Sequence, residues 1–365
     1  MAEIDPLLRT LRDRGGSDLH LKVGNPPIIR VDGDLTRLDL PVLRPEDTKR
    51  IMYGLLSPER QRVFEETHEM DVSYYLPDVA RFRVNVFQQK GYVGGVLRLI
   101  PIQVKTIDEM GLPQVLKYLA MRPRGLMLVT GPTGSGKSTT LAAMVDYINE
   151  NKAAHIITIE DPLEFLHFDK LSCLNQRELG EDTHSFAEAL KHCLRQNPDV
   201  ILVGEMRDLE TIQLAITAAE TGHLVFATLH TTDAAQTIDR IIDVFPPEQQ
   251  EQIRAQLAAT IEGIVCQQLL QRKGGKGRVP AFEIMLGTPA VKTLIREAKT
   301  HQVPTIIQTG LELGMVPLDQ YLIGLVKDQV VDYEQALQKC SNPRDFQQRA
   351  QRVLGSHLGG ATLAT

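Results

Sequence analysis

The sequence lacks any long hydrophobic run. It contains no stretch of ~18 consecutive apolar residues, which is about the length that a transmembrane helix needs. Its first ten residues, MAEIDPLLRT, also lack the apolar segment of a secretion signal. We therefore expect a protein that is made and kept in the cytoplasm.

Cysteine is scarce. The four cysteines stand at 173, 193, 266 and 340, and none forms a C-x-x-C pair. This spacing argues against both a zinc site and a disulfide framework. We expect buried or incidental thiols, because a free cysteine behaves as a small hydrophobic residue.

Positive charge is not in excess either. The 40 lysines and arginines are outnumbered by 46 aspartates and glutamates, which gives a net charge of −6. A negative overall field does not favour bulk binding of nucleic acid. We therefore expect no nucleic-acid partner. With 42% hydrophobic and 24% charged residues, the 365-residue chain has the composition of a globular protein with room for two domains.

Residues 1–100 are predicted to form a small mixed domain. A short helix is expected at 3–14, and apolar residues alternate with polar ones at 19–23 and again at 81–86. Turn residues separate these segments, for example Asp32-Gly33-Asp34. The pattern is typical of an antiparallel sheet with one apolar face.

Residues 101–112 are predicted to link this domain to an α/β core at 113–285. Apolar strands are expected at 126–130, 156–159, 200–203 and 224–228, with helices between them. Such alternation predicts a mainly parallel sheet covered by helices. An amphipathic helical region is expected at 286–350, and a flexible tail at 351–365.

The strongest motif in the sequence is a complete Walker A pattern, G-x-x-x-x-G-K-[ST]. An apolar strand precedes it and a helical run follows it, which is the context that a phosphate-binding loop requires. Glycines let backbone N–H groups converge on phosphate oxygens, and the helix N-terminus adds positive potential. Lys137 is expected to reach the β- and γ-phosphates, and Ser138 to bind Mg²⁺. The expected nucleotide-binding residues are Gly131, Pro132, Thr133, Gly134, Ser135, Gly136, Lys137, Ser138 and Thr139.

Two acidic segments follow strands of the same predicted sheet. Glu205 ends the sequence DVILVGE, where a carboxylate could orient and deprotonate the attacking water. Glu160 and Glu164 lie in ITIEDPLEF, which could hold Mg²⁺ through water or position the nucleophile. The alternative for Glu205 is a helix-capping role, and for the second segment a solvated turn set by Pro162.

Histidines and arginines supply further candidates. His223 and His230 flank the strand predicted at 224–228, which suggests a γ-phosphate sensor or a link to a neighbouring subunit. Arg81, Arg83 and Arg98 lie in the N-terminal domain, which has no phosphate motif of its own. They could act as arginine fingers toward another subunit. Structural histidines and a solvated basic sheet face are the alternatives.

These motifs occur in an order that resembles the secretion ATPase superfamily. They are Walker A at 131–138, ITIEDPLEF at 157–165, DVILVGE at 199–205 and TGHLVFATLHTT at 221–232. GGSDLHL at 15–21 and IREAKTHQVPTIIQTG at 295–310 are similar to segments of its twitching-motility branch, which retracts type IV pili. The zinc-binding tetracysteine insertion usual in pilus-extension and type II secretion ATPases is missing. One departure is the segment AVKTLIRE at 290–297, where Lys292 and Thr293 replace Arg and Asn of the retraction motif.

The resemblance implies a PAS-like N-terminal domain, a RecA-like ATPase domain and a hexameric ring that hydrolyses ATP with Mg²⁺. Glu205 would be the catalytic base. Glu164, His230 and the three arginines would also serve catalysis, His223 would bind the nucleotide, and Ser138 and Glu160 the metal. An inner-membrane platform protein and a paralogous pilus ATPase are the implied partners. A pilus-extension or type II secretion ATPase, and a weakly hydrolysing regulatory paralogue, are the alternatives.

Overall fold

The computed structural model describes residues 2–100, 104–275 and 277–354. The chain divides into two compact units, one made of residues 1–104 with 164–166 and the other of residues 105–163 with 167–365. Each unit has its own hydrophobic core. The linker predicted at 101–112 includes residues 101–103, which lie outside the described residues. Ile107 and Leu112, from its second half, are buried in the core of the second unit.

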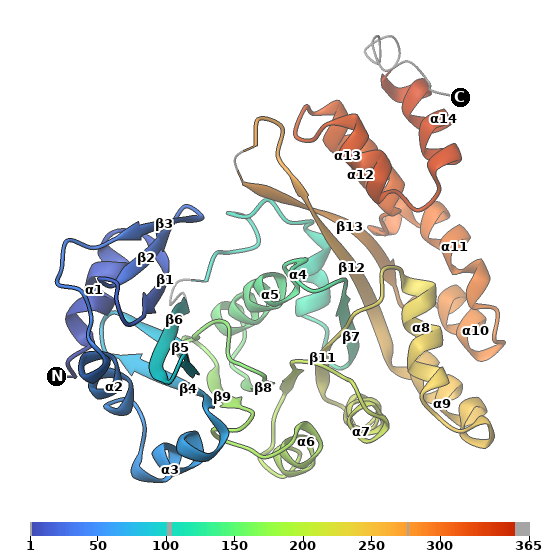
Figure 1. Cartoon of the computed structure of the whole chain (residues 1–365). Coiled ribbons are helices and arrows are strands. Elements are labelled where there is room, and N and C mark those ends of the chain that lie inside the picture. The colour runs from blue at the N-terminus through green and yellow to red at the C-terminus, as the bar shows by residue number, and fades with distance from the viewer. Residues whose placement is uncertain (1, 101–103, 276, 355–365) are drawn as a thin grey trace. The chain divides into compact units, whose positions relative to one another are not determined.

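The first unit is an antiparallel sheet packed against helices (Figure 1). The sheet order is β3-β2-β1-β6-β5-β4. Along β5, Phe82, Val84 and Val86 are fully buried, and the intervening side chains face away from the core. Its elements are α1 (Asp5–Asp13), β1 (Gly16–Leu21), β2 (Ile28–Val31), β3 (Asp34–Arg37), α2 (Pro45–Tyr53), α3 (Pro58–Thr67), β4 (Glu69–Leu76), β5 (Ala80–Gln89) and β6 (Tyr92–Ile100).

The second unit is built on a mainly parallel sheet with the order β13-β12-β7-β11-β10-β8-β9. Residues of β7, β10 and β11 are buried along the whole length of each strand, because helices and neighbouring strands cover them. The strands are β7 (Gly125–Thr130), β8 (His155–Glu160), β9 (Cys173–Glu178), β10 (Val200–Val203), β11 (Leu224–Leu229), β12 (Ile261–Gln271) and β13 (Arg278–Leu286). The predicted α/β fold class is confirmed.

The helices that connect these strands begin at polar caps. Asp208, Asp233 and Ser185 each accept a hydrogen bond from the backbone N–H three residues ahead, so the sequence marks where each helix starts. The helices are α4 (Val115–Ala120), α5 (Lys137–Asn151), α6 (Phe186–Cys193), α7 (Leu209–Glu220), α8 (Ala234–Asp243) and α9 (Pro247–Thr260).

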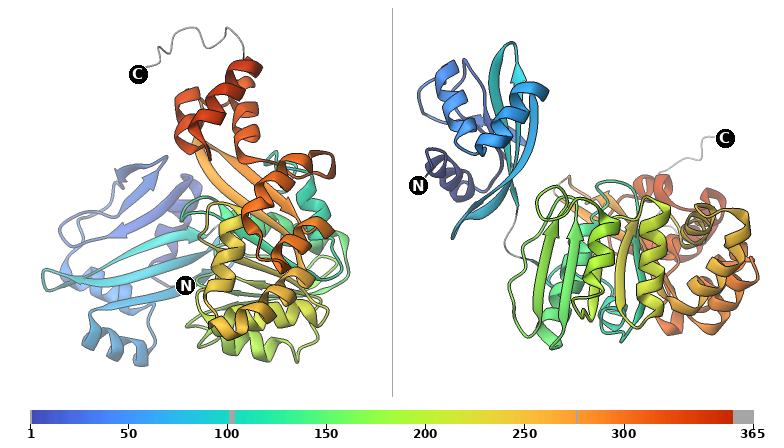
Figure 2. Two further views of the ribbon diagram at one scale, coloured as in Figure 1. Left: turned by 90° about the vertical axis from the view of Figure 1, so that its right-hand side faces the viewer. Right: turned by 90° about the horizontal axis from the view of Figure 1, so that it is seen from below.

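The C-terminal region is helical, as the sequence predicts. Part of it packs on the β12–β13 hairpin, where Leu270 and Val279 share a small apolar cluster with Leu322 and Phe346. In Figure 1 and in the left view of Figure 2, the red helices lie at the end of the orange hairpin. These helices are α10 (Pro289–Arg296), α11 (Val303–Thr309), α12 (Leu318–Lys327), α13 (Tyr333–Lys339) and α14 (Pro343–Leu354).

The structure departs from the sequence-based expectations in several segments. The hairpin β12–β13, the edge strand β9 and the helices α2 and α3 were not predicted. The tail expected from residue 351 is wrong for its first four residues, which continue α14, and residues 355–365 lie outside the described residues. In the part of the chain that the structure describes, no helix is both long and apolar enough to cross a membrane.

Candidate functional site

The Walker A sequence forms the loop between β7 and α5. Gly131, Gly134 and Gly136 all have positive φ, of 141°, 77° and 88°. These angles suit glycine and strain other residues. Gly136 is the N-cap of α5, so the loop leads directly into a helix whose first N–H groups are open to an anion.

Lys137 is folded back over this loop. Its Nζ donates hydrogen bonds to the carbonyl oxygens of Gly131, at 2.8 Å, and Pro132, at 3.3 Å. Ser138 and Thr139 follow it in the first turn of α5 and are partly buried. The loop therefore gathers an ammonium group, a hydroxyl group and a helix N-terminus at one place, and this combination can bind the phosphates of a nucleotide.

Glu205 follows β10 and His230 follows β11 in the parallel sheet, where β11 pairs with β7 and β10 with β11. The carboxyl ends of parallel strands lie on the same side of the sheet. Both residues therefore lie on the side where the P-loop follows β7. His230 Nε2 is 2.9 Å from Glu205 Oε1. The backbone around them is fixed, because Thr228 Oγ1 donates to the Gly204 carbonyl and the Met206 N–H to the Thr228 carbonyl at 3.1 Å.

Arg207 makes a two-pronged ion pair with Glu205. Its Nε lies 2.6 Å from Oε1 and its Nη2 lies 2.7 Å from Oε2. The pKa of Glu205 is lowered, mainly by the hydrogen bond from Arg207. Partial burial acts to raise this pKa, but the nearby His230 lowers it further. Glu205 is therefore ionised at neutral pH, as a general base must be. The sequence analysis did not single out Arg207, although it lies two residues after the acid.

Glu205, Arg207 and His230 also line a cavity of about 270 Å³. Its other lining residues include Thr231 and Arg240 as polar groups and Ile212 and Leu229 as apolar ones. The cavity gives solvent and small solutes access to the Glu205 carboxylate from the side of α7 and α8.

Glu160, the last residue of β8, is held within its own segment. Its Oε1 accepts hydrogen bonds from Thr158 Oγ1 at 2.7 Å and from Gln176 Nε2 at 3.4 Å. β8 is three strand positions from β7, roughly 14 Å across the sheet at ordinary strand spacing. A metal ion on Ser138 would therefore meet Glu160 through water rather than directly. Hydroxyl, carboxylate and water oxygens are the ligands that Mg²⁺ prefers, so this donor set fits that ion.

His223 precedes β11 and lies at its amino-terminal end, whereas the P-loop lies at the carboxyl ends of the parallel strands. Its carbonyl accepts a hydrogen bond from the Gly125 N–H, at the start of β7, and its Nδ1 is 2.9 Å from the Ala218 carbonyl oxygen. The six residues of β7 separate this end from the P-loop by roughly 20 Å. His223 and His230 flank one core strand, so they lie at opposite ends of it, and His223 is far from the P-loop of its own chain. The nucleotide-binding role of His223 stays a prediction, as does the link to a neighbouring subunit.

The three candidate arginines lie together on one face of the first unit. Arg83 on β5 is directly opposite Arg98 on β6, and Arg81 is two residues before Arg83 on the same face. Arg98 Nε donates to Asp18 Oδ1 at 2.8 Å, whereas Arg83 Nε is 4.0 Å from the nearest Asp71 oxygen. Burial opposes ionisation of Asp18, but hydrogen bonds from Arg98 and Ser17 outweigh it and lower its pKa.

Glu164 also groups with the first unit and is exposed. Its role beside the P-loop therefore stays a prediction from the family resemblance, as do the roles of the three arginines.

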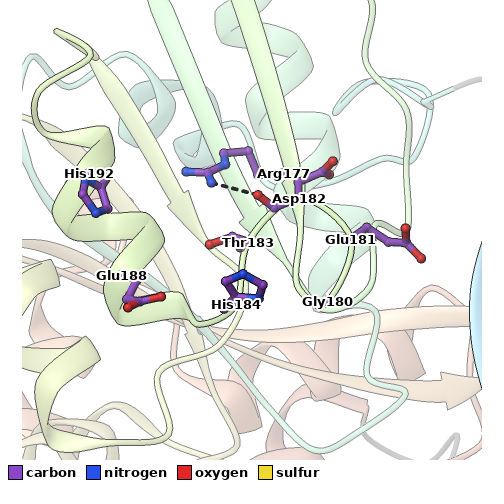
Figure 3. Close-up of a pocket in the computed structure, with 8 residues that line it drawn as sticks. All are labelled: Arg177, Gly180, Glu181, Asp182, Thr183, His184, Glu188 and His192. Atoms are coloured by element: carbon purple, nitrogen blue, oxygen red, sulfur yellow. Dashed lines mark hydrogen bonds between the residues drawn. The ribbon is translucent and has the colours of Figure 1, made fainter. Parts of the chain in front are cut away.

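A second hollow of about 300 Å³ lies between the end of β9 and α6 (Figure 3). Arg177, His184 and His192 face it together with Glu181, Asp182 and Glu188. Arg177 donates to the Asp182 carbonyl oxygen at 3.0 Å. Acidic and basic groups are mixed here. Within the described residues, no group of three or more His, Cys, Asp or Glu side chains is arranged to hold a metal ion.

Comparisons with known proteins agree with this architecture. The sequence model of the family described as Type II/IV secretion system protein matches residues 96–311. The type IV pilus retraction ATPase PilT of Pseudomonas aeruginosa is 53% identical over 344 residues, which cover 94% of this chain and all of that protein. The type IV pilus ATPase PilU of the same organism is 41% identical over 365 residues, or 99% of this chain and 95% of that protein.

A solved structure also matches closely. The crystal structure of the pilus retraction motor PilT with bound ADP superposes with a TM-score of 0.89 at 46% identity, and the match covers 95% of this chain and 99% of that one. Sequence, fold and P-loop geometry point the same way: the chain belongs to the type II/IV secretion ATPase family, in its pilus-retraction branch, and is an ATP hydrolase.

Proposed function

We propose that this ATPase is the cytoplasmic motor that retracts type IV pili, and that it works as a hexameric ring with ATP and Mg²⁺. Its likeness to the retraction motor over nearly the whole length of both chains carries the proposal. The absence of a tetracysteine insertion from the sequence and the P-loop site at the edge of the parallel sheet support it.

The residues of the site divide the chemistry of hydrolysis among them. The loop N–H groups and the N-terminus of α5 bind the phosphates, and Lys137 leaves its loop carbonyls to neutralise the β- and γ-phosphates. Ser138 and, through water, Glu160 would hold Mg²⁺, which would supply positive charge to stabilise the phosphates. Glu205 accepts a proton from the attacking water, and His230 orients the Glu205 carboxylate.

The three candidate arginines act between subunits in this proposal. A head-to-tail ring repeats one heterologous interface around the hexamer. Arg81, Arg83 and Arg98 would enter the nucleotide site of a neighbouring chain. Glu164 would serve catalysis with Glu160, in the acidic segment of its own chain. The ring would pass its motion to an inner-membrane platform protein, and a paralogous pilus ATPase could assist it.

One alternative is a weakly hydrolysing paralogue that modulates a stronger motor. The observation that favours this alternative is the segment 290–297, where Lys292 replaces the arginine of the retraction motif. Lys292 Nζ lies 3.3 Å from both the Ala259 carbonyl oxygen and Glu262 Oε1, and Arg122 also donates to Glu262, at 2.7 Å. Lysine lacks the planar two-pronged donor of arginine. Steady-state phosphate release by the assembled ring separates a motor from such a regulator.

Deletion of the gene, scored for surface pili and twitching, tests the proposed direction of force. A retraction motor leaves cells with excess pili that cannot twitch, whereas an extension motor leaves cells without pili. Complementation with the wild-type gene must restore twitching and complementation with Glu205→Gln must not. Bald cells, or rescue by Glu205→Gln, would contradict the proposal.

A further inference from the structure

Gln267 is a buried polar residue beside the P-loop, with 2% of its surface exposed. It lies on β12, which pairs in parallel with β7. Cys266 is opposite Thr130, the last residue of β7, so Gln267 lies beside Gly131, where the strand ends and the loop begins. The P-loop motif does not include this residue, which follows the motif by about 130 positions in the sequence.

Both ends of the Gln267 amide are hydrogen-bonded to the nucleotide-binding segment. Nε2 donates to the Ser135 carbonyl oxygen at 2.8 Å, and Oε1 accepts from Thr140 Oγ1 at 2.7 Å. Ser135 belongs to the loop and Thr140 to the first turn of α5. An amide side chain can donate and accept at once, so it ties the loop to the helix that carries Lys137.

The packing around Gln267 leaves room for glycine alone at two loop positions. A Cβ on Gly131 would lie 2.2 Å from the Gln267 carbonyl oxygen, and one on Gly136 would lie 2.8 Å from Gln267 Nε2. β12 therefore presses directly against the loop, and the first and last glycines of the motif accommodate it.

The hydrogen bond to Ser135 fixes the orientation of one peptide group. In a trans peptide the C=O and the following N–H point in opposite directions. Because the Ser135 carbonyl is held toward β12, the Gly136 N–H points away from β12 and cannot turn inward without breaking that bond. A backbone held in this way loses less conformational entropy when a phosphate binds.

We propose that Gln267 is a positioning residue that holds the P-loop in its phosphate-binding conformation before the nucleotide arrives. It acts through the loop and makes no contact with the nucleotide itself. Its removal should weaken binding of ADP, whose phosphates need the loop, while the fold stays intact.

Three variants test this with a fluorescent ADP analogue and a thermal melt. Gln267→Met keeps the side-chain length but removes both hydrogen bonds, and it should raise the Kd for ADP about tenfold, the worth of one to two hydrogen bonds. Gln267→Glu should weaken ADP binding more than Gln267→Met does, because it loses the donor and adds a negative charge. Gln268→Glu, which makes the same change on the opposite side of the strand, is the control and should stay within about twofold of the wild type.

A pH series separates positioning from a merely structural role. A buried carboxyl group has a raised pKa, so lowering the pH from 8 to 6 should protonate the group introduced by Gln267→Glu and restore a donor for Ser135. ADP affinity of that variant, relative to the wild type, should then recover, whereas Gln267→Met should show no recovery. If both Gln267 variants are folded and bind ADP within about twofold of the wild type at pH 8, the proposal fails.

Hydrogen exchange on the wild-type protein tests the proposal even if the variants do not fold. The Ser135 N–H donates to the Pro132 carbonyl oxygen at 3.1 Å within the loop, so it should be protected without nucleotide nearly as well as with ADP. Free exchange in the absence of nucleotide, with protection only when ADP is added, would show that Gln267 does not hold the loop and would overturn the proposal.

Discussion

At the scale of single residues, Glu205 is the general base of the proposed mechanism, and its neighbours affect it in opposing ways. Arg207 keeps the carboxylate ionised but also occupies both of its oxygens. A water molecule must gain access to one of these oxygens before Glu205 can accept a proton. Arg207 is exposed and can move, whereas Glu205 is mostly buried and held by His230.

Replacing Glu205 with glutamine separates chemistry from binding. Glu205→Gln keeps the shape of the side chain but removes the base, so hydrolysis should fall by about 10²–10⁴-fold. ATP binding should persist, because the P-loop is unchanged. Phosphate release and equilibrium binding of a fluorescent ATP analogue measure the two effects. Glu210→Gln, on the exposed start of α7, is the matched control and should leave both unchanged, and parallel loss of binding in Glu205→Gln would point to a structural role instead.

Glu283 predicts a pH dependence of stability. This carboxyl group on β13 accepts a hydrogen bond from the Ala234 N–H at 2.8 Å, but burial raises its pKa to about 7, and the nearby Asp233 and Asp319 add to the rise. The raised pKa means that the folded protein keeps a proton that the unfolded chain loses near pH 4.5. Stability should therefore fall by roughly 2–4 kcal/mol as the pH rises from about 4.5 to 7.

Glu283→Gln should remove that fall, because glutamine still accepts from Ala234 but does not ionise. Urea unfolding at pH 5 and pH 8 measures the difference for the variant, the wild type and Glu312→Gln, an exposed control. If the pH dependence of Glu283→Gln equals that of the wild type, then Glu283 is not the group responsible.

The elements show which parts of the fold can be predicted from sequence and which cannot. Strands β7, β8, β10 and β11 and helix α6 were predicted because short apolar runs, glycines and caps mark their ends locally. β12 was not, because Gly263, Gln267 and Gln268 interrupt its apolar run, while burial on both faces removes any alternation.

The residues of the candidate site also divide into those that local sequence marks and those that it does not. The P-loop, Glu205 and His230 belong to segments whose strand–loop context is local, and the structure brings them to one edge. Gln267 was missed because its two partners are distant in sequence. The separation of His223 from the P-loop was not foreseen, because two histidines close in sequence lie at opposite ends of one strand.

The N-cap of helix α7 should contribute measurably to the stability of the fold. Asp208 accepts hydrogen bonds from the Thr211 N–H and Oγ1, both at 2.8 Å, directly after the loop that bears Arg207. Asp208→Ala should cost about 1–2 kcal/mol of stability, whereas Asp208→Asn should retain most of it because asparagine also caps well. Chemical denaturation compares the two. Equal stabilities of both variants and the wild type would show that the cap contributes nothing.

At the scale of the whole molecule, the basic groups and the P-loop belong to different units. The first unit presents Arg81, Arg83 and Arg98 on one sheet face, and the second unit holds the nucleotide loop. Two like charges directly opposite each other on neighbouring strands, as Arg83 and Arg98 are, destabilise a sheet. Asp18 offsets this for Arg98 with a contact of 2.8 Å, whereas Arg83 lies 4.0 Å from Asp71. A ligand with negative charge, such as a neighbour's nucleotide, would account for keeping Arg83 there.

Mixed rings test this idea. Arg83 is the cleanest choice, because removing Arg98 would take from the buried Asp18 the nearer of its two arginine partners. Arg83→Ala alone should be nearly inactive, since a finger contributes on the order of 10³–10⁵ in rate, yet it should bind nucleotide at its own P-loop. Lys137→Ala alone should also be inactive. Arg37→Ala, an exposed arginine on β3, is the control and should keep full activity.

Mixing the two inactive proteins should restore part of the phosphate release, because some interfaces then join an intact P-loop to an intact Arg83. Subunit exchange must first be shown by energy transfer between labelled chains. Rescue would prove that the site is shared between subunits, since neither chain alone contains a complete set of groups. If the chains exchange and Arg83→Ala, Arg81→Ala and Arg98→Ala all fail to rescue Lys137→Ala, the sheet face is structural, and the charge needed to stabilise the transition state must come from the second unit, where Arg207 and Arg240 face the cavity beside Glu205.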